Sequence, residues 1–414
     1  MKEEQVRALQ LATEAGHILL ENGAEISRVE ETMETVASAF GVEEESFFVL
    51  SNGIITSGPQ YARAEFIPMK GTQLSKVVEV NQLSRDVSAG RCDLDGLQNR
   101  LSAIRAAKGK PWWELTIGIA LGVCSFCILF GGSLMDAAAT FCCGLLLGLY
   151  IAFVVPHMSR ITGNVTGGFV GGILCIFACY LSQSVGHLHL ANMIIGTIIA
   201  LVPGVSFTNG IRDLANEDYI AGTTRLTDAF ITFLCIALGV ALSLLVHGFF
   251  AGGIVDLGAP VVDPMAAKWG IQLLAAFIGT IGFSIMFGAP RRAYIDCGLA
   301  GLAGWLVFLG FSGRWVSAGV VLAAFAGGLA VALMSHIQAR YRKCPSVVFL
   351  VCGIIPLVPG GGIFWTAYHL VSDHLAVAAT TGFTALKVTI AIAASIILAS
   401  ELFDRVLKKL LYNA

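Results

Sequence analysis

The chain has 414 residues, of which 56% are hydrophobic and 13% are charged. Because soluble domains carry about 25% charged residues, this composition excludes an ordinary soluble protein and indicates an integral membrane protein. The net charge of −2 says nothing useful about partners, and no basic stripe suggests nucleic acid. Residues 1–110 hold 28 of the 54 charged side chains, so we expect a small polar domain followed by a large membrane domain.

The first 110 residues have the pattern of a small α+β domain. Four segments have helical apolar spacing, at 4–21, 26–40, 72–89 and 93–107. "SFFVLSNGIITSG" and "YARAEFIPM" have the pattern of strands separated by turn residues. Ser27 and Glu30 are spaced as a capping box at the start of the second helix. The start of the chain has no apolar core of the signal-peptide type, so we expect this domain in the cytoplasm.

Ten apolar segments follow, some of them only just long enough to cross a hydrocarbon core, which needs about 20 residues. They lie near 114–131, 134–155, 166–185, 188–206, 227–251, 269–288, 293–311, 316–337, 345–364 and 377–402. Pro111, Trp112 and Trp113 precede the first segment and place two aromatic rings at interface depth. We expect two membrane domains of five spans each, at 111–256 and 257–414.

The loops between these segments carry a charge bias that predicts their orientation. If residues 1–110 are cytoplasmic, the outer loops hold only Lys268 and Arg314. The inner loops and the tail then hold eleven basic residues, namely Arg160, Arg212, Arg225, Arg291, Arg292, Arg340, Arg342, Lys343, Arg405, Lys408 and Lys409. Because cytoplasmic loops of membrane proteins are rich in Lys and Arg, both termini are expected in the cytoplasm.

A seven-residue pattern, IIxLVPG, occurs twice in the sequence. "IIALVPG" at 198–204 returns 156 positions later as "IIPLVPG" at 354–360. With gaps of one residue, the same offset aligns Trp113 with Trp269, Gly131 with Gly288, and Thr223-Thr224 with Thr380-Thr381. These matches predict an internal duplication of the membrane part.

An odd number of spans in each half has a geometric consequence, because the second half must then enter the membrane in the opposite direction. The expected fold is a mainly α-helical polytopic membrane protein. It has about ten transmembrane helices in two inverted five-helix repeats, besides the N-terminal α+β domain. Many secondary transporters have such repeats, with the substrate between them near the midplane. A duplication retained only for stability is the alternative.

Proline and glycine interrupt both copies of the repeated string. Inside a helix, Gly costs about 1 kcal/mol and Pro about 3 kcal/mol, and irregular backbone at membrane depth needs surrounding protein or a water-filled cavity. Helix ends at such breaks offer N–H groups to a carboxylate and carbonyl groups to an ammonium group. We therefore predict a substrate pathway lined by Pro203, Gly204, Ser206, Thr208, Asn209, Pro359, Gly360, Gly361, Trp365, Thr366 and Tyr368. Alternatively, the string ends a span at the interface and its glycines serve helix crossing.

Few ionisable residues lie deep in the apolar segments, and such residues are often functional. Lys387 lies about ten residues into the last segment, so we add it to the predicted pathway as a partner for a carboxylate. Asp228 and Asp296 are candidates for proton coupling, because a carboxylate facing a buried lysine keeps that lysine charged. A structural ion pair or a contact with lipid headgroups is the alternative for all three.

No cofactor and no metal site are expected. The histidines show no HxxxH or HExxH spacing, and the cysteine pairs have no accompanying His or carboxylate cluster, so they are expected to pack as small hydrophobic residues. A GxxxxGK[ST] phosphate loop is also missing, which argues against ATP as the energy source. Ser27 and Ser51 stand in no GxSxG elbow, so a membrane-tethered hydrolase or sensor is kept only as an alternative.

Longer stretches resemble a known family. "NGAEISRVEETMETVASAFGVE", "SNGIITS" and "LVPGVSFTNGIRDLANEDYIAGTTRL" are similar to the first half of threonine/serine exporter (ThrE) family proteins. "FSIMFGAPRRAYIDCGLAG" and "IIPLVPGGGIFWTAYHLV" are similar to the second half, and in some bacteria the two halves are separate chains. The resemblance covers nearly the whole chain. It implies a multi-pass exporter of the cytoplasmic (inner) membrane that is driven by the proton-motive force.

The resemblance also implies the substrates, which are threonine and serine or, in split members, C4 dicarboxylates such as succinate. Both classes carry a carboxylate that Lys387 fits, and an amino acid needs a further partner for its ammonium group, such as broken-helix carbonyls or Asp228. We therefore expect a transporter and not an enzyme, with a small-molecule substrate, protons and the lipid bilayer as partners. A homo-oligomer and a channel are left open.

Overall fold

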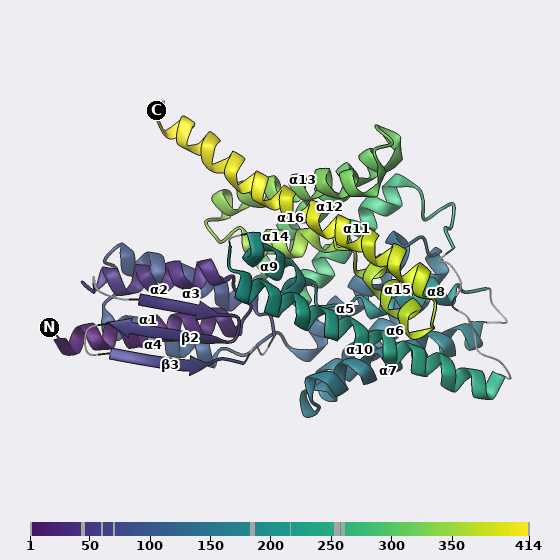
Figure 1. The fold of residues 1–414 in the computed structure, drawn as a ribbon, viewed down its shortest axis with the longest axis horizontal. Helices are drawn as coiled ribbons and strands as arrows, with labels where there is room; N and C mark the ends of the chain where they lie inside the picture. The colour runs from purple at the N-terminus through teal and green to yellow at the C-terminus, as the bar shows by residue number, and fades with distance from the viewer. Residues whose placement is uncertain are drawn as a thin grey trace.

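The computed structural model describes residues 2–42, 46–58, 61–68, 71–182, 187–215, 217–251, 257 and 261–412. We refer to residues 2–106 as the N-terminal region, which lies at one side of the helices that follow it (Figure 1). Residue 256, at the expected boundary between the two membrane domains, lies outside the described residues.

The N-terminal region has the expected helices and strands. They are α1 (Lys2–Glu21), α2 (Ile26–Ala39), β1 (Ser46–Leu50), β2 (Gly53–Gly58), β3 (Tyr61–Phe66), α3 (Leu74–Ser88) and α4 (Leu94–Ala106). The sheet is antiparallel in the order β1-β2-β3. Helices α1 and α2 pack on it through buried side chains such as Leu19, Met33 and Ile54, and α3 and α4 pack against these helices.

Helix α2 begins differently from the sequence prediction. Its N-cap is Glu25, and no side chain caps the helix. The expected capping box of Ser27 and Glu30 is therefore wrong, because Ser27 already lies within the first helical turn. Glu30 instead accepts a hydrogen bond of 3.3 Å from the Val49 amide of β1, and the Glu25 carboxylate pairs with Arg212, far along the chain.

Eight helices in the described ranges are long and apolar enough to cross a membrane. They are α5 (Trp112–Leu129), α6 (Leu134–Phe153), α7 (Arg160–Leu181), α10 (Tyr219–Ala251), α11 (Trp269–Met286), α12 (Tyr294–Leu309), α13 (Gly319–Arg342) and α16 (Leu375–Tyr412). Short turns η1 (Val155–His157), η3 (Arg291–Ala293) and η4 (Gly310–Arg314) lie between them. The expected polytopic helical fold is thus confirmed.

Two further segments are broken helices. The first comprises α8 (Leu190–Ile198) and α9 (Gly204–Ala215). The second comprises α14 (Val347–Ile354), the turn η5 (Ile355–Leu357) and α15 (Gly360–Val371). The second segment bends by 52° and raises the crossings to nine if it counts as one. The first segment lies where the sequence predicts a span at 188–206, and α9 continues beyond it.

The same pairs of helices pack in both halves of the membrane part. Helix α5 contacts α6 as α11 contacts α12, α7 contacts α10 as α13 contacts α16, and α9 contacts α10 as α15 contacts α16. The halves join where α5 crosses α11, and glycines allow this close approach, since a Cβ on Gly282 would lie 2.6 Å from the Gly118 carbonyl oxygen. In Figure 1, α9 and α14 lie toward the N-terminal region, whereas α8 and α15 lie on the far side.

Both breaks have the same local geometry. The amide of Gly204 donates to the Val202 carbonyl at 2.8 Å, and the amide of Gly360 donates to the Val358 carbonyl at 2.7 Å. The helix that follows each break starts from a proline carbonyl, Pro203 in the first and Pro359 in the second, which accepts a bond of 2.9 Å. Proline lacks an N–H group and suits this position before a helix, so each break also defines the start of the next helix.

The N-terminal region also contacts the second half. At the start of α3, the amides of Leu74 and Ser75 donate to the carbonyls of Phe287 and Gly288, both at 2.9 Å. The first N–H groups of a helix have no hydrogen-bond partner within the helix. The carbonyls of Phe287 and Gly288 supply partners for two of these groups at the start of α3. Gly288 has a φ of +64°, and a Cβ there would lie 3.2 Å from the Gln73 Cα. The turn between α11 and α12 is thereby held against the N-terminal region.

Candidate functional site

The two breaks are in direct contact with each other. A Cβ on Gly204 would lie 2.9 Å from Ile355 Cδ1, and a Cβ on Gly360 would lie 2.8 Å from Ile199 Cδ1. Gly204 and Gly360 hold matching places in the repeated string, as do Ile199 and Ile355. The same glycine–isoleucine contact therefore occurs twice, with the roles of the two halves exchanged.

Two cavities lie beside the breaks. The central pocket, of about 300 Å³, lies between α9, α10, α15 and α16 and is lined by residues that include Phe207, Phe233, Ile363 and Thr366. The α15 pocket, of about 420 Å³, is lined by residues 356–359 together with residues of α12, α15 and α16. The linings of both cavities are mainly apolar, so these cavities can hold the apolar part of a small molecule but offer few groups that would bind a charge.

A third cavity lies between the first break and the N-terminal region and has more polar groups in its lining than the other two. This junction pocket, of about 370 Å³, is lined by Glu21, Gly23, Gly71, Thr72, Val155, Pro156, Met158, Arg160, Val205, Ser206, Asn209 and Arg225. Its lining comes from the end of α1 and the turn after it, from the segment before α3, from η1 and the start of α7, and from α9 and α10. It combines hydroxyl, amide and guanidinium groups, which are the groups that bind polar metabolites.

Charged residues are buried next to the junction pocket. We call Glu25, Asn209, Arg212, Asp213 and Arg225 the junction cluster. Arg225 is 1% exposed and donates to the Asp213 carboxylate at 2.7 Å and to the Ala24 carbonyl at 3.0 Å. Arg212 pairs with Glu25 at 2.7 Å. The Nδ2 group of Asn209 donates to the Gly23 carbonyl at 2.9 Å. The cluster therefore joins the turn after α1 to α9 and α10.

Asp213 lies outside the membrane-spanning helices and has an unusual protonation equilibrium. Burial raises its pKa to about 6, partly offset by the attraction of Arg225, and the nearby Glu25 raises it further. A carboxyl group with a pKa near 6 can gain and lose a proton close to neutral pH. Unlike a normal aspartate, Asp213 can thus respond to modest changes in pH.

Some polar atoms of the junction cluster are buried without a hydrogen-bond partner. They are Asn209 Oδ1, one terminal nitrogen of Arg212 and Arg225 Nε. Such atoms normally find partners, and exceptions need an explanation. Asn209 and Arg225 also line the junction pocket. One buried acceptor and one buried donor therefore lie at the edge of the same cavity.

The structure separates the residues that we predicted as pathway. Ser206 and Asn209 line the junction pocket, Thr366 lines the central pocket, and Pro359 lines the α15 pocket. Gly204 and Gly360 form the contact between the breaks described above. Pro203 supplies the carbonyl that starts α9.

The remaining helix residues of the prediction pack inside the protein. Thr208 is buried, and its hydroxyl donates to the Gly204 carbonyl at 2.8 Å. A Cβ on Gly361 would lie 3.0 Å from the Phe130 ring, so Gly361 permits close packing. Trp365 and Tyr368 lie in an aromatic group on α15 with ring centroids 5.5 Å apart. These positions shape the broken helices and do not line the three cavities.

The three ionisable candidates lie elsewhere. Lys387 is on the exposed face of α16, beside the exposed Leu386 and Ile390, and lines none of the three cavities. Asp228 pairs with Arg160, and Asp296 pairs with Arg342 at 2.7 Å. Both aspartates thus have an arginine partner near the end of a span.

Sequence reasoning found Asn209 of the junction cluster but missed the charged members. In the sequence, Arg212 and Arg225 entered only the count of loop charges, and Glu25 and Asp213 were not singled out. The available signal was the acidic Glu25 in "EIS" and the adjacent Arg212 and Asp213 in "NGIRDL", within a chain of few charges. What brings these residues together is the packing of the turn after α1 on α9 and α10, which is a long-range contact. In the described part of the chain, no group of His, Cys, Asp and Glu is placed to hold a metal.

Comparison with known proteins gives consistent results for most of the chain. A curated threonine/serine exporter of Corynebacterium glutamicum is 22% identical over 403 residues, covering 94% of this chain and 80% of the relative. A probable threonine/serine exporter of Mycobacterium tuberculosis is 21% identical over 377 residues, covering 86% of this chain and 69% of the relative. The probable succinate transporter subunit YjjP of Escherichia coli is 22% identical over 259 residues, 60% of this chain and 98% of the relative. No solved structure matches the chain.

Family models also match both halves. The model described as putative threonine/serine exporter matches residues 10–247, and that described as threonine/serine exporter, ThrE, matches residues 272–402. The first match alone covers more than half of the 414 residues. The chain therefore belongs to the threonine/serine exporter family, a family of membrane transporters and not of enzymes.

Proposed function

We propose that this protein exports threonine and serine across the cytoplasmic (inner) membrane, with both termini in the cytoplasm. The observation that carries the proposal is the junction pocket, a polar cavity between the N-terminal region and the first broken helix. The basic residues of the loops on this side support its cytoplasmic orientation. Substrate would then enter from the cytoplasm through this pocket.

We also propose that the membrane part consists of two inverted five-span repeats, at 111–256 and 257–414. The exchanged contacts of Gly204 with Ile355 and of Gly360 with Ile199 support a two-fold axis between the breaks. The matching helix pairs of the two halves support the same axis. An axis of this kind lets the halves exchange conformations, which is the basis of alternating access in inverted-repeat transporters.

The substrate path follows the two breaks. On our proposal it runs from the junction pocket past Ser206 and Asn209 to the central pocket at Thr366, and leaves by the α15 pocket at Pro359. Helices α9 and α15 start at Gly204 and Gly360, and helix starts favour a carboxylate. The central pocket has an apolar wall that accommodates the small side chain of the substrate.

The junction pocket favours an amino acid over a simple anion. The unpaired Oδ1 of Asn209 accepts a hydrogen bond from an ammonium group, and the unpaired Nε of Arg225 donates one to a carboxylate. Ser206 and Thr72 add hydroxyl groups that match the hydroxyl of threonine or serine. A zwitterion with a hydroxyl group uses all of these partners at once.

Proton coupling is assigned to Asp213. Asp228 and Asp296, the candidates from the sequence, are each held by an arginine near the end of a span. Asp213 is 2% exposed, contacts Arg225 of the junction pocket, and has a pKa of about 6. Protonation of Asp213 would release Arg225, and through it the turn after α1, which couples the proton to the entrance of the pathway.

Export of a C4 dicarboxylate is the second candidate function. The probable succinate transporter subunit of Escherichia coli matches 60% of this chain, and Arg160 and Arg225 both line the junction pocket. Two arginines fit the two carboxylates of succinate. This reading leaves Asn209 Oδ1 unpaired, because ionised succinate has no donor.

The variants Asn209→Leu and Asn209→Asp decide between these substrates. In proteoliposomes loaded with threonine, Asn209→Leu should weaken apparent affinity by about tenfold or more, since a hydrogen bond to a charged group contributes about 1.5–3 kcal/mol. Asn209→Asp keeps an acceptor but loses the N–H donor to the Gly23 carbonyl, so it should retain threonine export at a reduced rate and should lower succinate export further. Asn164→Leu, in α7 away from the three cavities, is the matched control. Unchanged threonine affinity in Asn209→Leu, or faster release of succinate than of threonine by the wild type, would contradict the main proposal.

A further inference from the structure

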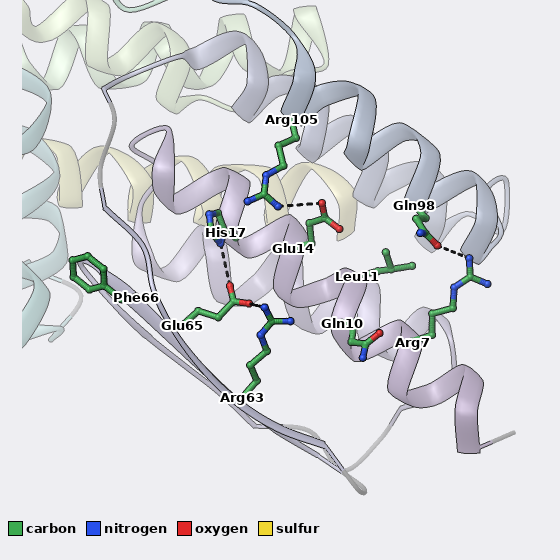
Figure 2. A pocket seen from close by; sticks show the side chains of 10 residues that line it. All are labelled: Arg7, Gln10, Leu11, Glu14, His17, Arg63, Glu65, Phe66, Gln98 and Arg105. Carbon is green, nitrogen blue, oxygen red and sulfur yellow. Dashed lines mark hydrogen bonds and ion pairs between the residues drawn. The ribbon is translucent and has the colours of Figure 1, made fainter. Parts of the chain in front are cut away.

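The largest cavity among those described lies in the N-terminal region, away from the proposed pathway. It has a volume of about 780 Å³ and lies between α1, β3 and α4. Small-molecule sites typically have volumes of about 300–1,000 Å³. The cleft is lined by Arg7, Gln10, Leu11, Glu14, His17, Arg63, Glu65, Phe66, Gln98 and Arg105 (Figure 2). It is therefore large enough for a metabolite bigger than threonine or succinate.

Arginines from three separate elements line this cleft. Arg7 comes from α1, Arg63 from β3 and Arg105 from α4. Figure 2 shows Arg105 directed at Glu14 and Arg63 directed at Glu65. Arg7 is directed at Gln98, away from the other two, so Arg63 and Arg105 are the arginines that can bind an anion in the cleft, because arginine recognises phosphate and carboxylate in a bidentate manner.

Each of these arginines already has a partner: Arg7 pairs with Asp95 and Gln98, and Arg63 and Arg105 pair with glutamates. Arg105 reaches Glu14 only at 3.5 Å, and Arg63 pairs with Glu65, which also accepts from His17 at 3.0 Å. Arg63 and Arg105 are 55% and 50% exposed. Exposed ion pairs contribute at most about 1 kcal/mol. A phosphate group, with two charges and several acceptor oxygens, would gain more from these arginines than the glutamates do.

Other groups of the cleft fit the rest of a nucleotide. The carboxylate of Glu14 and the amides of Gln10 and Gln98 can bind sugar hydroxyls, which both donate and accept hydrogen bonds. Phe66 ends β3 at the edge of the cleft and is 74% exposed, and an exposed aromatic face stacks on a base. Its ring points away from Arg63 and Glu65 (Figure 2), so a base would reach it past the end of the strand. Charge and hydroxyl partners thus lie in the cleft, with an aromatic ring at its edge.

We propose that this cleft is a regulatory site for a nucleotide-sized phosphate ester, which Arg63 and Arg105 hold by its phosphate. Helix α1 forms the floor of the cleft and ends at Glu21, just before Gly23 and Ala24, whose carbonyls accept from Asn209 and Arg225. From His17 to Gly23 is six residues, or about 9 Å at the helical rise of 1.5 Å per residue. Binding in the cleft therefore bears directly on the junction cluster.

The test uses the purified full-length protein and three probes: adenosine monophosphate, ribose 5-phosphate and inorganic phosphate. Binding is measured by calorimetry, and threonine export is measured in proteoliposomes with and without adenosine monophosphate on the side of the N-terminal region. The variants are Arg63→Ala with Arg105→Ala, and Arg105→Glu alone. Arg28→Ala is the matched control, because Arg28 also has an exposed ion pair, with Glu31, but does not line the cleft.

Adenosine monophosphate should bind more tightly than ribose 5-phosphate, and inorganic phosphate should bind weakest. Both cleft variants should weaken the binding of adenosine monophosphate by about tenfold or more, whereas Arg28→Ala should leave it unchanged. The nucleotide should change the rate of threonine export by the wild type but not by the cleft variants. The proposal is overturned if adenosine monophosphate does not bind at millimolar concentration, if it binds both cleft variants as well as Arg28→Ala, or if phosphate binds equally well. Binding without any change in export would overturn the regulatory role. These binding results do not depend on which substrate is exported.

Discussion

Removal of the Arg225 charge tests the junction cluster most directly. In Arg225→Met, a side chain of similar length stays apolar, but Asp213, 2% exposed, loses the partner that lies 2.7 Å away. Leaving one charge of a buried pair without its partner costs about 3–5 kcal/mol. The lost hydrogen bond to the Ala24 carbonyl adds about 1 kcal/mol. We therefore expect the free energy of unfolding to fall by about 4 kcal/mol or more at pH 7.5.

The companion variant Asp213→Leu should also be strongly destabilised, because it leaves the Arg225 guanidinium buried and unpaired. The double variant removes both charges at once, and replacement of a whole buried pair by apolar residues is often close to neutral. We expect the loss in the double variant to be smaller than the sum of the single losses by at least about 2 kcal/mol. Denaturant titration of the detergent-solubilised protein, followed by tryptophan fluorescence, measures all four proteins.

A second ion pair on the same helix provides the control. Arg160 and Asp228 also form an arginine–aspartate pair with α10, but Arg160 is 54% exposed. Arg160→Met should therefore cost less than about 1 kcal/mol. If Arg225→Met costs no more than Arg160→Met, or if the losses of Arg225→Met and Asp213→Leu simply add, the pair does not join the N-terminal region to α9 and α10 as described.

Three further predictions follow from single contacts. Gly204→Ala should lower the free energy of unfolding by about 1–3 kcal/mol through overpacking, and Ile355→Val should restore it. Gly360→Ala and Ile199→Val should behave in the same way. If denaturant titration finds neither rescue, the exchanged contact is not formed. The pKa of Asp213 is about 6 in the folded protein and near 3.8 in the unfolded chain. The stability that this difference contributes, about 3 kcal/mol, is therefore fully present below about pH 4 and is lost as the pH rises through about 6. Asp213→Asn should flatten this part of the curve of stability against pH, and an equally steep curve in the variant would contradict the assignment. Lys387→Ala should leave threonine export close to the wild-type rate, because Lys387 is exposed on α16; a large loss in proteoliposomes would return Lys387 to the pathway.

The sequence predicted local structure well where local physics decides it. Apolar periodicity placed α1 to α4 within a few residues, and alternating residues before turns placed the strands of the sheet. The repeated string "LVPG" located both broken helices, because proline and glycine interrupt a helix wherever they occur. The sequence prediction was wrong at Ser27. The N-cap of α2 is Glu25, and its carboxylate pairs with Arg212, far along the chain.

The candidate site depended on contacts that no local pattern contains. Residue type and hydropathy by themselves determined a polar N-terminal region, apolar helices, and two matching breaks, because these properties follow from short windows of sequence. Only the tertiary structure decided that Lys387 points outward, that each glycine of the breaks meets the isoleucine of the other, and that Asp213 and Arg225 are buried beside a polar pocket. The burial and pairing of these charges are set by segments up to 201 positions apart in the sequence. The free energy of a buried charge depends on the groups around it, which only the folded chain brings together.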